Sequence, residues 1–211
     1  MKITIFGASS ATGKLLVEKA LAQGHTVAAF VRDASNLSAS DDHLKIITGD
    51  ARNPADVDTA IQGADAVLST IGPKGKQTTV AAESTQNIAA AMNKHGVERL
   101  VLVSVGGISV APDQRSGLGK LIGKLLKILL GPIFTDRERQ LEILQSSGLD
   151  WVAVRVPRLL DGPATGKVFA GYWGQKGVGS SLTRADLADF MLAQLNEDTW
   201  LGKAPVVTNS K

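Results

Sequence analysis

Gly7 and Gly13, near the beginning of the chain, have the type and spacing of residues in a phosphate-binding loop. They enclose five small residues, and the segment lies between the apolar run 3–6 and a helical pattern. A glycine after a strand allows a sharp turn, and a second glycine allows the new helix to pack closely against the sheet. The free N–H groups and positive dipole end of such a helix bind anions. The segment predicts a site for the pyrophosphate of a dinucleotide, formed by Gly7, Ser9, Ser10, Ala11, Thr12 and Gly13.

Ser10 is where this loop departs from the usual G-x-x-G-x-x-G spacing, because it replaces the middle glycine. The loop also differs from that of nucleoside triphosphatases. Five residues instead of four separate Gly7 from Gly13, and Leu15 stands where a Ser or Thr would bind magnesium. A chance cluster of small residues at a strand-to-helix turn is the alternative interpretation.

Arg32 indicates which dinucleotide the loop would bind. It directly follows the apolar run 26–31, at a position that faces the adenosine ribose in dinucleotide-binding folds. An acidic residue there accepts hydrogen bonds from the 2′-hydroxyl of NAD, whereas an arginine binds the 2′-phosphate of NADP. The sequence therefore predicts NADP(H) as the cofactor, with NAD(H) bound more weakly.

Apolar runs alternate with helical patterns along the whole chain, and most of these runs are continuous stretches of Val, Ile, Leu and Ala. Such runs are typical of parallel strands covered on both faces. Right-handed crossovers then predict an α/β fold of three layers, a doubly wound Rossmann-type parallel sheet of order 3-2-1-4-5-6 in a single domain, 1–211. The expected strands are 3–6, 26–31, 45–48, 66–71, 100–105 and 151–156, and the expected helices are 12–23, 54–62, 78–95, 136–147 and 184–196.

The residues at the carboxyl ends of these strands form the expected site, because ligands of doubly wound sheets bind there. Ser104 ends the fifth strand and is placed to orient a nicotinamide ring or an acceptor carbonyl; a hydroxyl that caps local backbone is the alternative. Arg158 is a candidate to hold an acidic substrate, with a surface ion pair as the alternative. The strand-end residues are Gly7, Arg32, Asp50, Gly72, Ser104 and Pro157.

Two segments after the fifth strand, 106–135 and 159–182, interrupt the alternation and are expected on the substrate side. Within the first, residues 117–131 place Lys120, Lys124 and Lys127 on one helical face and apolar residues elsewhere. One interpretation is a helix that binds a membrane surface or a partner. We favour the other, a flanking helix or lid that docks on its own domain.

The charged residues from Asp136 to Glu142 are expected to form a solvated helix face without a catalytic role. Tyr172 and Lys176 match the Tyr-x-x-x-Lys pair of short-chain reductases, but they follow the sixth strand amid glycines instead of lying on a helix after the fifth. Tyr172 is also the only tyrosine. Hydride transfer to a flavin, quinone or linear tetrapyrrole leaves a delocalised anion that water can protonate. The sequence therefore favours a planar, conjugated acceptor.

The composition excludes several other classes of site. The chain has no cysteine, and its three histidines are far apart, so no metal site is predicted. The net charge is +3 and only 4% of residues are aromatic, which does not indicate a nucleic-acid surface. The first strand follows Met1 directly, and no apolar run reaches the roughly 18 residues of a membrane span. We expect a cytoplasmic monomer or homodimer.

Short motifs from the first strand to the last helix give the chain a family resemblance. They are Ile5-Phe-Gly-Ala, Thr12-Gly, Val31-Arg-Asp, Gly49-Asp, Asp65-Ala-Val, Gly72, Asn87-Ile-Ala-Ala-Ala-Met, Lys94-His-Gly-Val, Ser147-Gly-Leu, Trp151-Val-Ala-Val, Pro157 and Asp186-Leu-Ala-Asp-Phe-Met. With these motifs the chain resembles the NmrA-like group of atypical short-chain dehydrogenases/reductases, and within it the biliverdin IXβ reductases, also called flavin reductases.

The resemblance implies an NADPH-dependent reductase and assigns a role to each matching position. The chain departs from the family at three positions. Val105 replaces the usual second hydroxyl residue, Arg158 replaces the usual histidine, and Asn36 replaces the usual second basic residue. These departures keep open a second function, an NADP(H)-binding redox sensor or regulatory protein without turnover. The implied contacts are Thr12 and Gly13 with the pyrophosphate, Arg32 with the 2′-phosphate, Asp50 and Ala51 with adenine, Ile71 and Gly72 with ribose, and Ser104 and Pro157 with nicotinamide.

Overall fold

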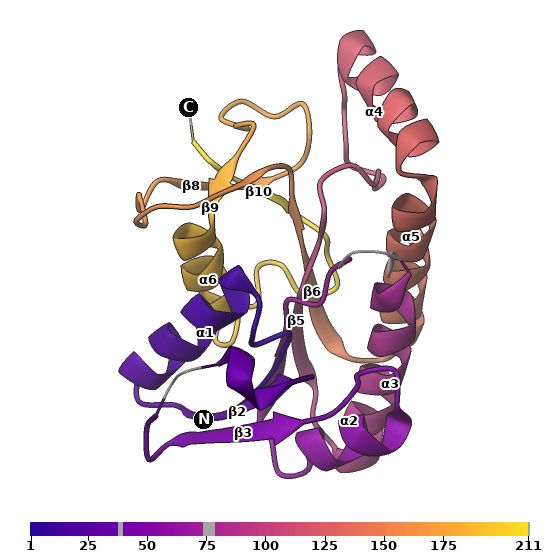
Figure 1. The fold of residues 1–211 in the computed structure, drawn as a ribbon. Coiled ribbons are helices and arrows are strands. Elements are labelled where there is room, and N and C mark those ends of the chain that lie inside the picture. The colour runs from indigo at the N-terminus through magenta and orange to yellow at the C-terminus, as the bar shows by residue number, and fades with distance from the viewer. Residues whose placement is uncertain (38–39, 74–78, 211) are drawn as a thin grey trace.

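A computed structural model describes residues 1–37, 40–73 and 79–210 as three layers, with a sheet between two layers of helices (Figure 1). The strands are β1 (Lys2–Phe6), β2 (Thr26–Val31), β3 (Leu44–Thr48), β4 (Ala66–Ser69), β5 (Arg99–Val105), β6 (Asp150–Val156), β7 (Leu159–Leu160), β8 (Val168–Gly171), β9 (Leu182–Thr183) and β10 (Val206–Asn209). The helices are α1 (Ala11–Ala22), α2 (Pro54–Ile61), α3 (Val80–His95), α4 (Gly117–Leu129), α5 (Gly131–Ser146) and α6 (Arg184–Ala193), with a 3₁₀ turn, η1, at Ala34–Asn36.

The main sheet confirms the predicted topology and extends it. Its order is β3-β2-β1-β4-β5-β6-β10-β8, so the first six strands lie in the predicted sequence and are all parallel. The sequence analysis missed β10, which lies parallel to β6, and β8, which pairs antiparallel with β10. Neither strand is a continuous aliphatic run, because β8 has the sequence VFAG and β10 the sequence VVTN.

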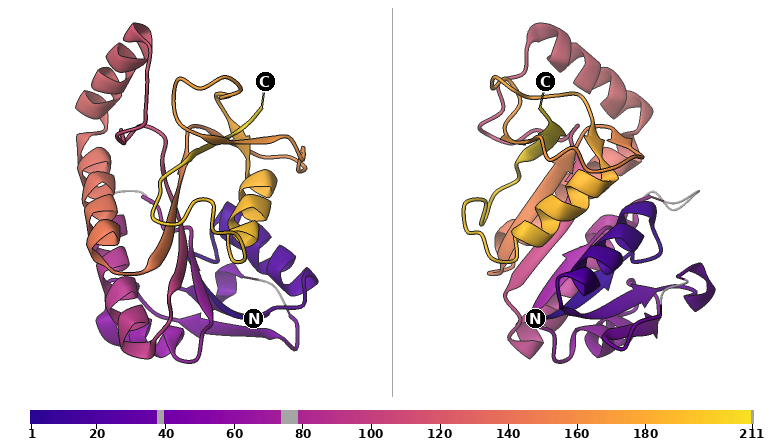
Figure 2. Two further views of the ribbon diagram at one scale, coloured as in Figure 1. Left: turned by 180° about the vertical axis from the view of Figure 1, so that it is seen from behind. Right: turned by 90° about the vertical axis from the view of Figure 1, so that its left-hand side faces the viewer.

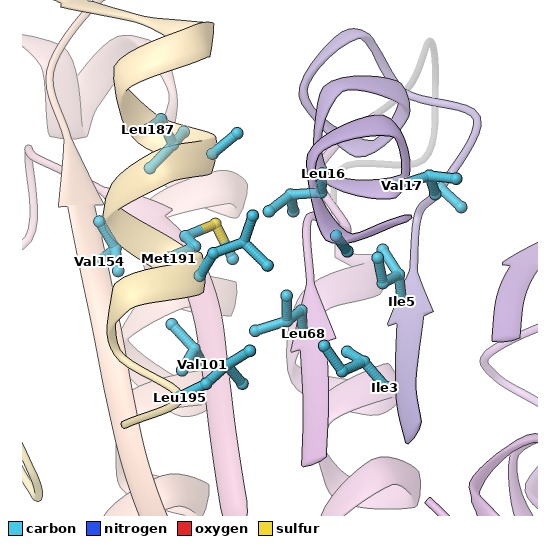
Figure 3. Packing of buried hydrophobic residues seen from close by; sticks show 14 of the residues in the cluster. Ile3, Ile5, Leu16, Val17, Leu68, Val101, Val154, Leu187, Met191 and Leu195 are labelled. Atoms are coloured by element: carbon cyan, nitrogen blue, oxygen red, sulfur yellow. The ribbon is translucent and has the colours of Figure 1, made fainter. Parts of the chain in front are cut away.

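Helices cover both faces of the sheet, which explains why the strands are apolar throughout. Helices α1 and α6 lie on one face and α2, α3 and α5 on the other (Figures 1 and 2). In Figure 3, Leu16 of α1 and Met191 of α6 point toward one another above Leu68 of β4, and all three are fully buried. Burying each such side chain contributes about 1.5–3 kcal/mol.

The expectation that the charged residues of 136–142 form a solvated face was wrong for Asp136 and Arg137, because α5 turns them toward α3 and the sheet, whereas Arg139 and Glu142 are exposed. Asp136 and Arg137 are 6% and 2% exposed. The carboxylate of Asp136 accepts hydrogen bonds from the N–H groups of Ala81 and Ala82, at 3.0 and 3.1 Å. It thereby satisfies the first N–H groups of α3, which have no acceptor within their own helix.

Helix α4 is not packed into the body as we expected for residues 117–131. It extends from the body on the side of the carboxyl ends of the strands (Figures 1 and 2). Lys127 joins it to α5 by donating to both carboxylate oxygens of Glu138, at 2.7 and 3.0 Å. None of the described helices is long and apolar enough to cross a membrane.

Asp186, in the first turn of α6, ties the preceding glycine-rich segment to this helix. Its carboxylate accepts hydrogen bonds from the N–H and hydroxyl of Thr165, the hydroxyl of Thr183 and the amide of Asn209, at 2.6–3.1 Å. Burial favours the neutral acid, but these hydrogen bonds outweigh it and lower the pKa of Asp186 to about 2.

We expect Asp186→Asn to destabilise the protein at pH 7 by on the order of 2 kcal/mol, because a neutral amide accepts weaker hydrogen bonds than a carboxylate. The folded-state pKa is below the ordinary value of 3.8. The ionised carboxylate therefore stabilises the fold fully above this value and loses its contribution as the pH falls toward 2. Thermal unfolding from pH 7 to pH 2 should show that the difference in stability between the wild type and Asp186→Asn becomes smaller below about pH 4.

Asp189→Asn is the matched control, since Asp189 lies in the same helix and its exposed side chain pairs with Lys19. We expect it to change stability by less than about 1 kcal/mol. A gap between wild type and Asp186→Asn that stays constant over the whole pH range would contradict this assignment.

Candidate functional site

A cavity of about 490 Å³ lies at the carboxyl ends of β1, β2, β4 and β5, where the predicted topology places a ligand. The residues that line this cavity do not include Gly13, Pro157 or Arg158. The other site residues predicted from the sequence do line it: Gly7, Ser9, Ser10, Ala11, Thr12, Arg32, Asp50, Ala51, Ile71, Gly72 and Ser104.

The loop before α1 presents backbone N–H groups to this cavity. Gly7 has φ +76°, a conformation that favours glycine, and its carbonyl accepts a hydrogen bond from Ser10 N at 2.9 Å. The hydroxyl of Ser10 accepts from Gly13 N at 2.9 Å, so the serine that replaces the middle glycine caps the helix. The first N–H groups of a helix have no intrahelical acceptor, which leaves those of Ala11 and Thr12 at the cavity.

Gly13 lies outside the cavity lining and contributes to the site because it has no side chain. A Cβ atom at this position would overlap the carbonyl oxygen of Gly7 and would lie 2.8 Å from the Cα atom of Ala8. Only glycine therefore allows α1 to begin this close to the turn after β1, as the spacing predicted.

The end of the cavity beside β2 and β3 carries two arginines. Arg32 is exposed there, and Arg52 also lines the cavity. Arg52 donates to both carboxylate oxygens of Asp50, at 2.5 and 3.1 Å, and these hydrogen bonds lower the pKa of Asp50. Our sequence analysis missed Arg52, although its place two residues after a strand-end aspartate was a usable signal. The chain has Asn36 where the family usually has a second basic residue. Arg52 supplies a second basic group in this cavity instead.

A third arginine, Arg137 of α5, lies at the floor of the cavity and is only 2% exposed. Its guanidinium donates to the carbonyls of Ile71 and Val103, at 3.0 and 3.1 Å, and to the side chain of Gln140 at 2.9 Å. Burial lowers the pKa of Arg137 to about 10, so the group is still charged at neutral pH. It joins the ends of β4 and β5 and makes the cavity more positive. Its helical context gave no sequence signal for this position.

The end of the cavity beside β5 and β6 is mostly apolar around one hydroxyl. Ser104 is 2% exposed and lies between the lining residues Val103 and Val105. Pro157 packs instead against Gly106, and Arg158 is exposed. Both are therefore beside the cavity, not among its described lining residues.

Arg184, which the sequence analysis did not single out, lines this end in place of Arg158. It donates to the exposed carboxylate of Asp161 at 2.7 Å. An exposed ion pair of this kind contributes little stability and leaves the guanidinium able to bind another anion.

Tyr172 has the position expected of a residue outside the reaction centre. It follows β8, and its ring lies edge-on to Trp200 with centroids 5.9 Å apart. The described lining of the cavity includes no tyrosine, histidine or lysine. The arrangement can bind an anionic dinucleotide and orient a planar ligand, but those residues supply no tyrosine as a proton donor.

Comparisons with known proteins agree with this geometry. The NAD(P)H-binding family matches residues 7–198. An uncharacterized protein of Mycobacterium tuberculosis is 27% identical over 155 residues, which are 74% of this chain and only 14% of that protein. This chain therefore matches a small part of its mycobacterial relative.

Two solved structures share the fold over nearly their whole length. ChuY, an anaerobillin reductase from Escherichia coli O157:H7, has a TM-score of 0.80 and 24% identity, covering 99% of this chain and 97% of ChuY. A short-chain dehydrogenase/reductase from Veillonella parvula in complex with NADP has a TM-score of 0.82 and 17% identity, covering 98% and 94%. The chain belongs to the NAD(P)H-binding family of Rossmann-type proteins, in agreement with its resemblance to the atypical short-chain dehydrogenases/reductases.

Proposed function

We propose that the protein acts in the cytoplasm as an NADPH-dependent reductase that transfers hydride to a planar, conjugated acceptor such as a flavin, a quinone or a linear tetrapyrrole. The observation that carries this proposal is the division of the cavity into an anion-binding end and a mostly apolar end around Ser104, where Arg184 also lines the wall. NADPH, when bound, supplies the hydride.

The anion-binding end fits NADP(H). The N–H groups of Ala11 and Thr12 would bind the pyrophosphate, and the guanidinium groups of Arg32 and Arg52, which both line this end, would bind the 2′-phosphate. Asp50 holds Arg52 beside the cavity and balances part of its charge. The residues predicted from the resemblance and the missed Arg52 thus support one cofactor.

The apolar end fits a conjugated acceptor. Val103, Val105, Val156 and Leu159 provide flat contact area, and Ser104 provides one hydroxyl to orient a ring or a carbonyl. A delocalised product anion takes its proton from water, so the lack of a tyrosine at the described lining is compatible with turnover. The shared fold of ChuY supports a tetrapyrrole as one acceptor to be tested.

The test is NADPH oxidation, followed by absorbance, with FMN, a quinone and biliverdin in turn and with NADH as the alternative donor. We expect turnover with at least one acceptor and faster turnover with NADPH. Ser104→Ala should lower the rate of hydride transfer about tenfold, a loss of about 1.4 kcal/mol, with unchanged NADPH affinity. Ser146→Ala, at the exposed end of α5, is the control and should keep the full rate. Equal rates of hydride transfer in the wild type and both variants would show that Ser104 has no role in the reaction.

A redox sensor without turnover is the second candidate, and the lack of a tyrosine at the described lining favours it. Such a protein would bind NADPH and NADP⁺ and discriminate between them without oxidising NADPH. Tight binding of both forms with no turnover of any acceptor would establish the sensor and exclude the reductase.

We expect Arg32→Ala to weaken NADPH binding about 10- to 100-fold, because one charge-assisted contact contributes about 1.5–3 kcal/mol. NADH, which lacks the 2′-phosphate, should bind with nearly unchanged affinity. Fluorescence titration with both nucleotides measures the two effects. Arg139→Ala is the control, since Arg139 is exposed on α5 away from the described lining. Equal losses for both nucleotides would mean that Arg32 has a structural role.

A further inference from the structure

Helix α4 carries a concentration of exposed apolar side chains. Leu121, Leu125, Ile128 and Leu129, together called the α4 apolar stripe, are 64%, 56%, 79% and 68% exposed. Leu130 follows them and is 42% exposed. In the part of the chain that the structure describes, the other exposed large hydrophobic residues are Met1 and Val168 of β8, which are less exposed than the stripe, at 44% and 36%. A contiguous apolar surface of this kind marks a binding surface.

The stripe has the geometry of a surface made for contact. Its members recur three or four residues apart, so they lie on one side of the helix. The helix itself extends from the body on the same side as the carboxyl ends of the strands (Figures 1 and 2). A planar surface can therefore approach the stripe.

The charges of α4 select what binds there. The helix contains Lys120, Lys124 and Lys127 and no acidic residue, and the side chain of Lys124 is exposed beside the stripe. Lys127 pairs with Glu138 of α5 through an exposed ion pair. An apolar stripe on a helix whose charged residues are all lysines matches a bilayer with anionic headgroups, which accepts leucine side chains and attracts cations at the same time.

A second copy of the chain is a poorer match for this surface. A two-fold contact places the same helix against itself, and α4 has no carboxylate to pair with its own lysines. A membrane-spanning role is also excluded for α4, because its 13 residues extend only about 20 Å, less than the roughly 30 Å of a bilayer core. The helix has the length to lie on a bilayer and not to cross it.

We propose that α4 docks this protein on the surface of an anionic bilayer, with the α4 apolar stripe inserted at the headgroup boundary and Lys124 against lipid phosphates.

The test is flotation of the purified full chain with vesicles of phosphatidylcholine alone or mixed with phosphatidylglycerol. We expect binding to the mixed vesicles at low salt, and weaker binding as salt is added. Leu125→Glu combined with Ile128→Glu should weaken it about tenfold or more. Lys124→Gln should weaken it about fivefold. Val168→Glu, which changes an exposed apolar residue on β8, is the control and should bind as the wild type does.

Unchanged circular dichroism and NADPH affinity in each variant show that the effect is local. The proposal is overturned if the wild type binds no vesicles at low salt, if it binds both kinds of vesicle equally, or if the Leu125→Glu and Ile128→Glu protein binds as well as the wild type. Sedimentation without lipid measures the oligomeric state. A dimer that these two substitutions abolish would assign the stripe to a second copy of the chain instead.

Discussion

A Gly13→Ala variant is expected to lose NADPH binding and to unfold well below the wild-type temperature. The added Cβ would overlap the carbonyl oxygen of Gly7 and lie 2.8 and 2.9 Å from the Cα and carbonyl carbon of Ala8. These are backbone atoms, so the loop must move to make room. Overpacking of this kind destabilises by about 1–3 kcal/mol, and each kcal/mol lowers Tm by about 2–4 °C in a domain of this size. The moved loop no longer directs its N–H groups toward the pyrophosphate.

Gly131→Ala is the control for this prediction. Gly131 is the first residue of α5, and no described atom lies within 4 Å of its added Cβ. Alanine is the better helix former by up to about 1 kcal/mol, so Tm should be unchanged or slightly higher. Calorimetry and an NADPH titration measure both variants. A Gly13→Ala protein with wild-type Tm and affinity would show that the loop can adapt, against the packing argument.

Asp113→Ala is expected to destabilise the protein by about 3–5 kcal/mol, because it leaves a buried guanidinium without its carboxylate. Asp113 accepts from both terminal nitrogens of Arg155, at 2.7 and 2.8 Å, and the two side chains are 3% and 0% exposed. Burial favours the neutral acid, but the hydrogen bonds from Arg155 outweigh it and lower the pKa of Asp113. Denaturation with urea measures the loss.

The exposed pair of Arg99 and Asp198 provides the comparison, since it has the same chemistry at 2.8 Å with Asp198 75% exposed. Asp198→Ala should change stability by less than about 1 kcal/mol. Asp113 also accepts from the N–H of Trp173 at 3.1 Å, so its loss should speed proteolysis in the segment 106–116. Similar losses in both variants would mean that burial does not strengthen the Arg155 pair.

The parts of the structure that could be predicted are those whose signal lies in residues close together in the sequence. A continuous apolar run such as 26–31 predicted β2 to the residue, and the glycine spacing of 7 and 13 predicted the close packing of α1. Right-handed crossovers then determined the order of six strands. The strand ends, and the cavity with them, followed from that order.

The parts that were missed depend on which surfaces meet. Nothing local distinguishes the buried Arg137 from the exposed Arg139 two residues later, because only the packing of α5 against α3 and the sheet separates them. The periodicity of α4 likewise shows that it has an apolar side, but not whether the body covers that side. Strands β8 and β10 pair with each other beyond β6, and this pairing depends on which parts of the chain meet in the fold.

The pairing of β8 with β10 also determines when the outer part of the sheet can form during synthesis. In the described sheet β10 separates β8 from β6, so β8 has no neighbour until β10 has been made. At about 5–20 residues per second, the ribosome takes roughly 2–7 s to reach β10 after finishing β8. The six strands from β1 to β6 have all been synthesised before then, whereas β8 has no partner in the sheet until β10 follows. Slow codons between the two strands would therefore delay the earliest time at which β8 can pair.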